Sequence, residues 1–306
     1  MARKLRAAAA TIVFVLGLGA VYLYHRVTSL ESEHVAGDVH VVFGLGGNVG
    51  ILKTDKGAVI VDTMTFPIQA RGIRELASQL GGGAAQAIIN THYHADHTHG
   101  NPAWPVGLRV VATKRTRDYL NLFDAEFWQD EAAGTAPNDT FEKTHEMRIG
   151  GKTIRSYDMG RGHTGGDLVV LFVEDRVLHA GDLFFHRLYP NIDLEAGGSV
   201  RDWSATLERV LALKFDHVIP GHGPVGSRED LAGFARFMKE LAEKVAQAVD
   251  DGMTLEQTLE SVNLKEDEGY SPMAIPFIMN LDRDFVVKRA WEEATGVVKP
   301  VALPSG

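Results

Sequence analysis

The 306-residue sequence contains no cysteine. This absence excludes disulfide bonds and thiolate ligands, so a metal ion would have to be held by histidine, aspartate or glutamate. Basic residues are the minority: 31 Lys and Arg face 40 Asp and Glu, and the net charge is -9. Because contacts to phosphate need clustered cations, this balance argues against a nucleic-acid partner. The apolar content of 45% is that of an ordinary globular protein.

One long hydrophobic run lies near the N-terminus. Residues 7–24 carry no charge and follow a basic start at residues 1–6, a pattern typical of a signal peptide or a signal anchor. Tyr22 and Tyr24 favour the anchor, because cleavage sites need small residues. The basic start predicts a cytoplasmic N-terminus. We therefore expect a protein that is anchored in the inner membrane facing the periplasm or, after cleavage, secreted to the periplasm.

The remaining sequence predicts a polar linker at 25–37 and one large folded domain at 38–306. Short β-branched runs predict strands at 39–43, 49–53, 58–61, 87–89, 152–159, 176–180 and 217–219. Helical spacing of apolar residues predicts helices at 67–80, 200–213, 228–249, 254–261 and 282–294. Mixed strands and helices over this length favour one α/β sandwich. The stretch after Ser261 is weakly patterned, and either capping of the sandwich or covering of a site fits it.

Side chains that ligate metals follow the ends of four of these strand-like runs. A dense H-x-H-x-D-H cluster and three single residues together supply His92, His94, Asp96, His97, His163, Asp182 and His222. Rigid strands often fix positions in this way while the loops beyond them carry the chemistry. Imidazoles and carboxylates suit zinc, which activates water at neutral pH. We therefore expect these residues to converge on two zinc ions, with Fe or Mn as alternative metals.

The spacing sorts the residues into two sets. His92 and His94 are two positions apart at a strand end, which places both on one face. His163 would complete a three-histidine set with them, leaving an open position for water. The second set would be formed by the other three residues, Asp96, His97 and His222.

Two carboxylates have distinct predicted roles between these sets. Asp182 is the natural bridge, because each of its oxygens can bind one metal ion. Two zinc ions about 3.5–4 Å apart would share a hydroxide, and no Ser or Cys nucleophile would be needed. Asp62 follows a predicted strand and is a candidate to orient a ligand from behind.

In this order the motifs resemble the metallo-β-lactamase-fold superfamily of hydrolases. The resemblance runs from about Asp38 to about Asp250, and it includes Val61–Thr63, His92–His97, Gly162–Asp167, Ala180–Asp182 and Pro220–Gly223. It implies a four-layer αββα sandwich with the metals at one edge and the same assignment of ligands. Asp182 stands where β-lactamases proper usually carry Cys or Ser, and it is more similar to glyoxalase II, lactonases and related esterases.

The leading hypothesis is a binuclear zinc-dependent hydrolase of a small-molecule substrate. A metal-bridging hydroxide would cleave an ester, thioester or lactam, with Asp96 and Asp182 in catalytic roles. Arg187 and Tyr189 are candidates to face the substrate. Loops around 44–48, 64–67, 123–139 and 185–198 are expected to select it.

Two alternatives stay open on the sequence. The resemblance also implies, through the superfamily's dioxygenases, a mononuclear iron thiol or persulfide dioxygenase using His92, His163 and Asp182. The other alternative is a non-catalytic metal-binding accessory protein. The physiological substrate and the oligomeric state are left open.

Overall fold

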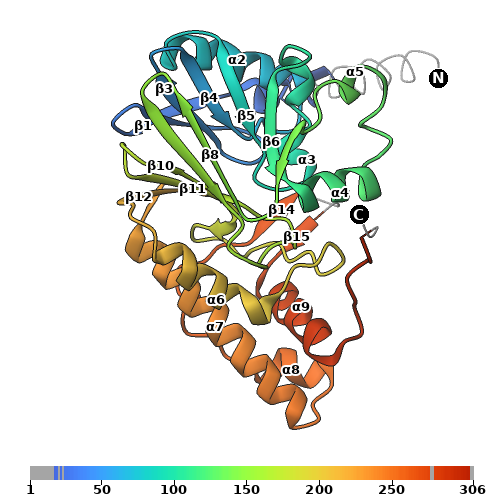
Figure 1. Ribbon diagram of the computed structural model, residues 1–306. Helices are drawn as coiled ribbons and strands as arrows, with labels where there is room; N and C mark the ends of the chain where they lie inside the picture. The colour runs from blue at the N-terminus through green and yellow to red at the C-terminus, as the bar shows by residue number, and fades with distance from the viewer. Residues whose placement is uncertain (1–16, 20, 23, 276–278, 304–306) are drawn as a thin grey trace, which may run out of the picture.

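Two β-sheets lie face to face in the computed structural model, which describes residues 17–303 except 20, 23 and 276–278 (Figure 1). The first sheet runs in chain order through β1 (Glu31–Ala36), β2 (Val39–Phe43), β3 (Val49–Thr54), β4 (Gly57–Val61), β5 (Ala85–Ile89), β6 (Arg109–Thr113) and β7 (Asp139–Phe141). The second has the order β13 (Gly226–Ser227), β12 (His217–His222), β11 (Val177–Phe185), β10 (Val169–Phe172), β9 (Lys152–Tyr157) and β8 (Thr144–Ile149).

Helices cover the outer face of each sheet (Figure 1). The first sheet is covered by α2 (Pro67–Leu80), and the second by α6 (Val200–Leu211), α7 (Arg228–Asp250) and α9 (Arg283–Thr295). Shorter helices are α3 (Ala95–Thr98), η1 (Asn101–Ala103), α4 (Lys114–Phe123), α5 (Asp130–Ala133) and α8 (Leu255–Ser261). The expected α/β sandwich is confirmed, and each predicted helix is present with ends within two residues of the prediction.

The layering follows from the period of two along the strands. On β4, Val59 packs between the two sheets, whereas Ile60 packs toward α2. On β10, Val170 faces the first sheet and Leu171 faces the outer helices. Fully burying one such side chain contributes about 1.5–3 kcal/mol. Three apolar clusters therefore join four layers and fix the strand ends that carry the site.

Two predicted boundaries were wrong. The expected linker at 25–37 contains β1, which pairs with β2 and extends the first sheet. Its residues are polar because β1 is an edge strand with mostly exposed side chains. Asp182 and His222 do not follow their strands but lie inside β11 and at the end of β12. Irregular register between these two strands lets both side chains leave the regular pleat there.

The chain after Ser261 both caps the sandwich and reaches the site's surroundings. Helix α9 packs through Val286 and Val287 into the cluster shared with α6 and α7. Before it, β14 (Met273–Ile275) and β15 (Met279–Leu281) form a separate hairpin.

At the N-terminus, most of the expected membrane segment, 7–24, lies outside the described residues. Among the helices that are described, none has the length and apolar character needed to cross a bilayer.

Candidate metal centre

The structure brings the seven sequence-predicted side chains into two adjoining groups. In each group the candidate ligand atoms lie within 4.8 Å of one another, and the groups are His92, His94, His163 and Asp182, then Asp96, His97 and His222. They come from the segment after β5, the loop after β9, and strands β11 and β12. Segments far apart in the sequence therefore supply one site at one edge of the sandwich.

Asp182 lies between the two groups with one oxygen toward each. Its Oδ2 is 3.8 Å from Nε2 of His92 and 3.5 Å from Nε2 of His163. Its Oδ1 is 3.1 Å from Nε2 of His97 and 3.5 Å from Nε2 of His222. The carboxylate is 4% exposed. This orientation is the one that a carboxylate shared by two cations needs.

Asp62 orients two of the histidines from behind. It is fully buried and accepts hydrogen bonds from the Thr91 amide and hydroxyl, both at 2.8 Å. Its Oδ2 is also 2.8 Å from Nδ1 of His97, and the Thr91 hydroxyl is 3.1 Å from Nδ1 of His92. Because these partners accept a hydrogen bond from the Nδ1–H group, each ring in its neutral form keeps its lone pair on Nε2. Both lone pairs then point into the site.

The other two histidines of the first group also have an acceptor beside their outer ring nitrogen. Nδ1 of His163 is 2.9 Å from the Asn191 carbonyl, which leaves Nε2 as the inward acceptor. His94 is reversed: its Nε2 is 2.9 Å from Asp193, and its Nδ1 faces Nε2 of His163 at 2.8 Å. Asp193 also accepts a 2.5 Å hydrogen bond from the Tyr93 hydroxyl. Sequence reasoning missed Asp193, whose only signal was that His94 needs an acceptor on its outer nitrogen.

The arrangement fits a bound cation. Within the described part of the chain, Nε2 of His92, Nε2 of His97 and Oδ1 of Asp182 are buried without a hydrogen-bond partner, which costs about 1–3 kcal/mol per group when nothing compensates. The lone pairs on Nδ1 of His94 and Nε2 of His163, which face one another at 2.8 Å, repel unless a positive charge lies between them. Nitrogen and carboxylate donors of this kind suit zinc and related transition metals.

The electrostatics of the two groups differ. Burial lowers the pKa of His92, and it lowers the pKa of His163 to about 4 despite the nearby Asp182. Burial also acts to lower the pKa of His222, but Asp182 and Asp96 outweigh it and raise this pKa to about 9. His92 and His163 therefore present neutral imidazoles, whereas the second group binds a proton where a cation would otherwise lie.

The two residues expected to face the substrate lie elsewhere. Tyr189 is 8% exposed, packs in the core beside Phe237 and donates a hydrogen bond to Asp267 at 2.8 Å. Arg187 is exposed and lines a surface cavity with Glu229, on the side of helix α7. The loop chemistry suggested contact with substrate, but the Tyr189 ring is buried and Arg187 shares its cavity with acidic residues.

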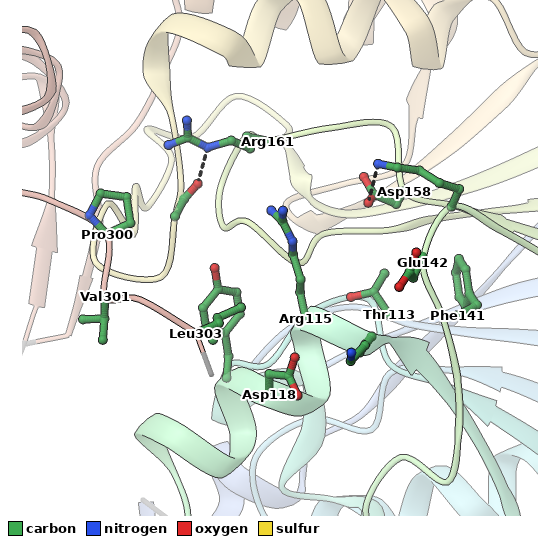
Figure 2. A pocket seen from close by; sticks show the side chains of 14 residues that line it. Thr113, Arg115, Asp118, Phe141, Glu142, Asp158, Arg161, Pro300, Val301 and Leu303 are labelled. Carbon is green, nitrogen blue, oxygen red and sulfur yellow. Dashed lines mark hydrogen bonds and ion pairs between the residues drawn. The ribbon is translucent and has the colours of Figure 1, made fainter. Parts of the chain in front are cut away.

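Two cavities lie near the site. A groove of about 400 Å³ opens onto His222. A larger cavity of about 600 Å³ lies beside α4, and Figure 2 shows Arg115 extending from this helix toward the loop that carries Arg161. Its acidic and basic side chains partly neutralise one another, as in the Lys143–Asp158 pair at 3.2 Å. None of the seven clustered residues lines this larger cavity, so the groove is the better candidate for a substrate.

Known enzymes are similar in sequence to this chain. A linear primary-alkylsulfatase from Pseudomonas sp. (strain ATCC 19151) is 24% identical over 272 residues, which are 72% of this chain and 51% of that protein. The chain thus spans about half the length of that relative. The type 2 metallo-beta-lactamase of Bacillus cereus is 24% identical over 180 residues, covering 58% of this chain and 67% of that protein.

Solved structures share the fold. The metallo-beta-lactamase from Pontibacter korlensis matches 69% of this chain and 99% of its own with a TM-score of 0.56 and 21% identity. The stereoselective inverting sec-alkylsulfatase Pisa1 from Pseudomonas sp. matches 88% of this chain and 51% of its own with a TM-score of 0.66 and 17% identity. The family model described as the metallo-beta-lactamase superfamily matches residues 42–222. The chain belongs to the metallo-beta-lactamase superfamily.

Proposed function

We propose that this protein is a binuclear zinc-dependent hydrolase that cleaves a carbonyl bond in an ester, thioester or lactam. The observation that carries the proposal is the position of Asp182, which turns one oxygen to each histidine group. Superfamily membership and the relatives named as hydrolytic enzymes support it. Two bound zinc ions would supply a hydroxide nucleophile at neutral pH and polarise the scissile carbonyl.

The protein's own residues would hold and orient this chemistry. His92, His94 and His163 would hold one ion, and Asp96, His97 and His222 the other. Asp96 is 35% exposed, more than its neighbours in the second group, and therefore lies on the open side where a substrate arrives. There its carboxylate would orient the attacking hydroxide.

The iron dioxygenase alternative uses only three of these residues. It would leave Asp96, His97 and His222 gathered without a role, although their ligand atoms lie within 4.8 Å of one another. A non-catalytic accessory protein would not need Asp182 to turn one carboxylate oxygen toward each histidine group. The observed geometry therefore favours the binuclear hydrolase over both.

A second hydrolytic reaction is also a candidate. The alkylsulfatase relatives match 72% and 88% of this chain, including segments beyond the residues 42–222 of the family model. Because the similarity to alkylsulfatases covers so much of the chain, we propose sulfate-ester cleavage as a candidate reaction beside carbonyl hydrolysis. We therefore place a primary alkyl sulfate beside the carbonyl substrates in the test.

The decisive experiment is a substrate panel on zinc-loaded protein. It comprises a chromogenic cephalosporin, a glutathione thioester, an acyl-homoserine lactone, an aryl ester and dodecyl sulfate. We expect turnover of at least one carbonyl substrate, abolished by chelation and retained without oxygen. Two zinc ions per chain support the binuclear site, whereas one iron ion and oxygen-dependent thiol oxidation would refute it.

The N-terminal sequence supports a further proposal, that the hydrolase domain lies outside the cytoplasm. The basic start and the uncharged run at 7–24 are its basis. A fusion of residues 1–37 to alkaline phosphatase should give an active periplasmic reporter, and an inactive fusion would count against export.

A further inference from the structure

The groove beside His222 has an apolar lining. Phe43 at the end of β2, Pro224 beyond β12, Leu188 and Met273 contribute hydrophobic surface. Among the residues that the structure describes, Glu33 is the only ionisable side chain besides His222 that lines it. A cavity with this lining favours an uncharged apolar group, because a charge would lose its hydration there without gaining a partner.

Leu188 and Met273 form a preorganised wall of this groove. The segment that carries Leu188 pairs with the segment before β14 through a parallel bridge to Ser271. Ser271 donates its amide to the Arg187 carbonyl at 2.9 Å, and the Tyr189 amide donates back to the Ser271 carbonyl at 3.2 Å. Both apolar side chains also pack against the core below α7. The wall is therefore fixed from both sides before a substrate binds.

The position of this wall connects it to the reacting centre. Leu188 lies six residues beyond Asp182, and the amide of the intervening His186 donates to the His222 carbonyl at 3.0 Å. His222 itself forms part of the groove. An acyl chain that extends from a carbonyl at the metal centre past His222 would therefore lie against Leu188 and Met273.

We propose that Leu188 and Met273 determine specificity by selecting substrates whose scissile carbonyl carries an extended, uncharged apolar chain. This inference rests on the proposed hydrolase function and names its substrate class. Burial of one methylene corresponds to about a fourfold gain in kcat/KM, and roughly twofold where one side stays open to water. Glu33 disfavours chains that end in a carboxylate.

The test measures kcat/KM of the zinc-loaded full chain for p-nitrophenyl acetate, butyrate and octanoate, and for the p-nitrophenyl monoester of octanedioic acid. We expect kcat/KM to rise roughly two- to fourfold per methylene from acetate to octanoate. The carboxylate-ended ester should fall below octanoate. In Met273→Ala the rise with chain length should flatten.

Met279→Ala is the matched control, because Met279 lies on the same hairpin in β15 but does not line the groove. It should keep the chain-length dependence of the wild type. A flat dependence in the wild type, or the same slope in Met273→Ala and the wild type, would overturn the inference while leaving the proposed hydrolysis intact.

A binding measurement separates failure of this inference from failure of the proposed function. Calorimetric titration with octanoate and acetate reports on the groove without turnover. If no ester is hydrolysed, the proposed ester hydrolysis fails, yet tighter binding of octanoate that is lost in Met273→Ala still supports the apolar groove. Equal binding of both acids in the wild type rejects it.

Discussion

Asp193→Ala should weaken one metal site and spare the other. The Asp193 carboxylate accepts a hydrogen bond from Nε2 of His94 at 2.9 Å. The two side chains are 14% and 19% exposed, respectively. Removing this acceptor frees the ring to adopt the tautomer whose Nδ1 carries the proton and cannot bind a cation. Loss of such a partner typically lowers metal affinity about 10–100-fold, or about 1.4–2.7 kcal/mol. The second group contains no direct partner of Asp193, so we expect its affinity to stay within a few fold.

Competition titrations against a chromogenic zinc chelator measure this effect, with circular dichroism to establish that the variant is folded. Tyr93→Phe is the matched control, because it removes the other side-chain hydrogen bond to the same carboxylate and leaves the contact to His94. Tyr93→Phe should lower the zinc affinity of the first group by a smaller factor than Asp193→Ala does. Equal weakening of both sites in Asp193→Ala, or no weakening of either, would refute the tautomer argument.

Three further outcomes follow from the same geometry. Asp182→Ala should lose at least one zinc ion and its hydrolytic activity without unfolding, and unchanged turnover would exclude the bridging role. Removing zinc with a chelator should lower the melting temperature by roughly 5–10 °C, since free zinc at 100 times its Kd stabilises the folded state by about 2.7 kcal/mol; an unchanged melting temperature would show that zinc does not bind the native state. Zinc affinity of the second group should rise at least about tenfold per pH unit below pH 9, because the neighbouring carboxylates outweigh burial and raise the pKa of His222 to about 9 and also that of His97. His163 should add little pH dependence above pH 5 at the first group, because burial lowers its pKa to about 4. Affinities measured at pH 6, 7 and 8 test this, and parallel slopes would contradict it.

The part of the site that the sequence predicts most directly is the cluster from His92 to His97, because its spacing is local. The cluster from His92 to His97 follows a short strand, so the direction of its side chains depends on a few neighbouring dihedral angles. Helices α2 and α7 were equally accessible, since their apolar periodicity is strong and Pro67 and Ser227 mark their starts.

What the sequence could not show depends on contacts between distant segments. Asp193 lies in a loop without a motif, 99 residues from the histidine that it orients. Strand β1 appeared to be a linker because an edge strand can be polar on both faces. Tyr189 was assigned to the substrate side from its proximity to Asp182 in sequence, but its partner Asp267 lies 78 residues away. Each error concerns which surface covers a side chain, and composition carries no such information.

The close approach of the backbone explains why glycines accompany the ligands in the sequence motifs. A Cβ atom at Gly221 would lie 1.9 Å from Oδ1 of Asp182, and one at Gly47 would lie 2.2 Å from Cε1 of His97. Both distances are far below contact, so any side chain there would displace the bridging carboxylate or its histidine partner. The amide of Gly47 in turn donates to the Asp96 carbonyl at 3.0 Å. The metal geometry therefore depends on Gly221 and Gly47, two positions that contribute no ligand.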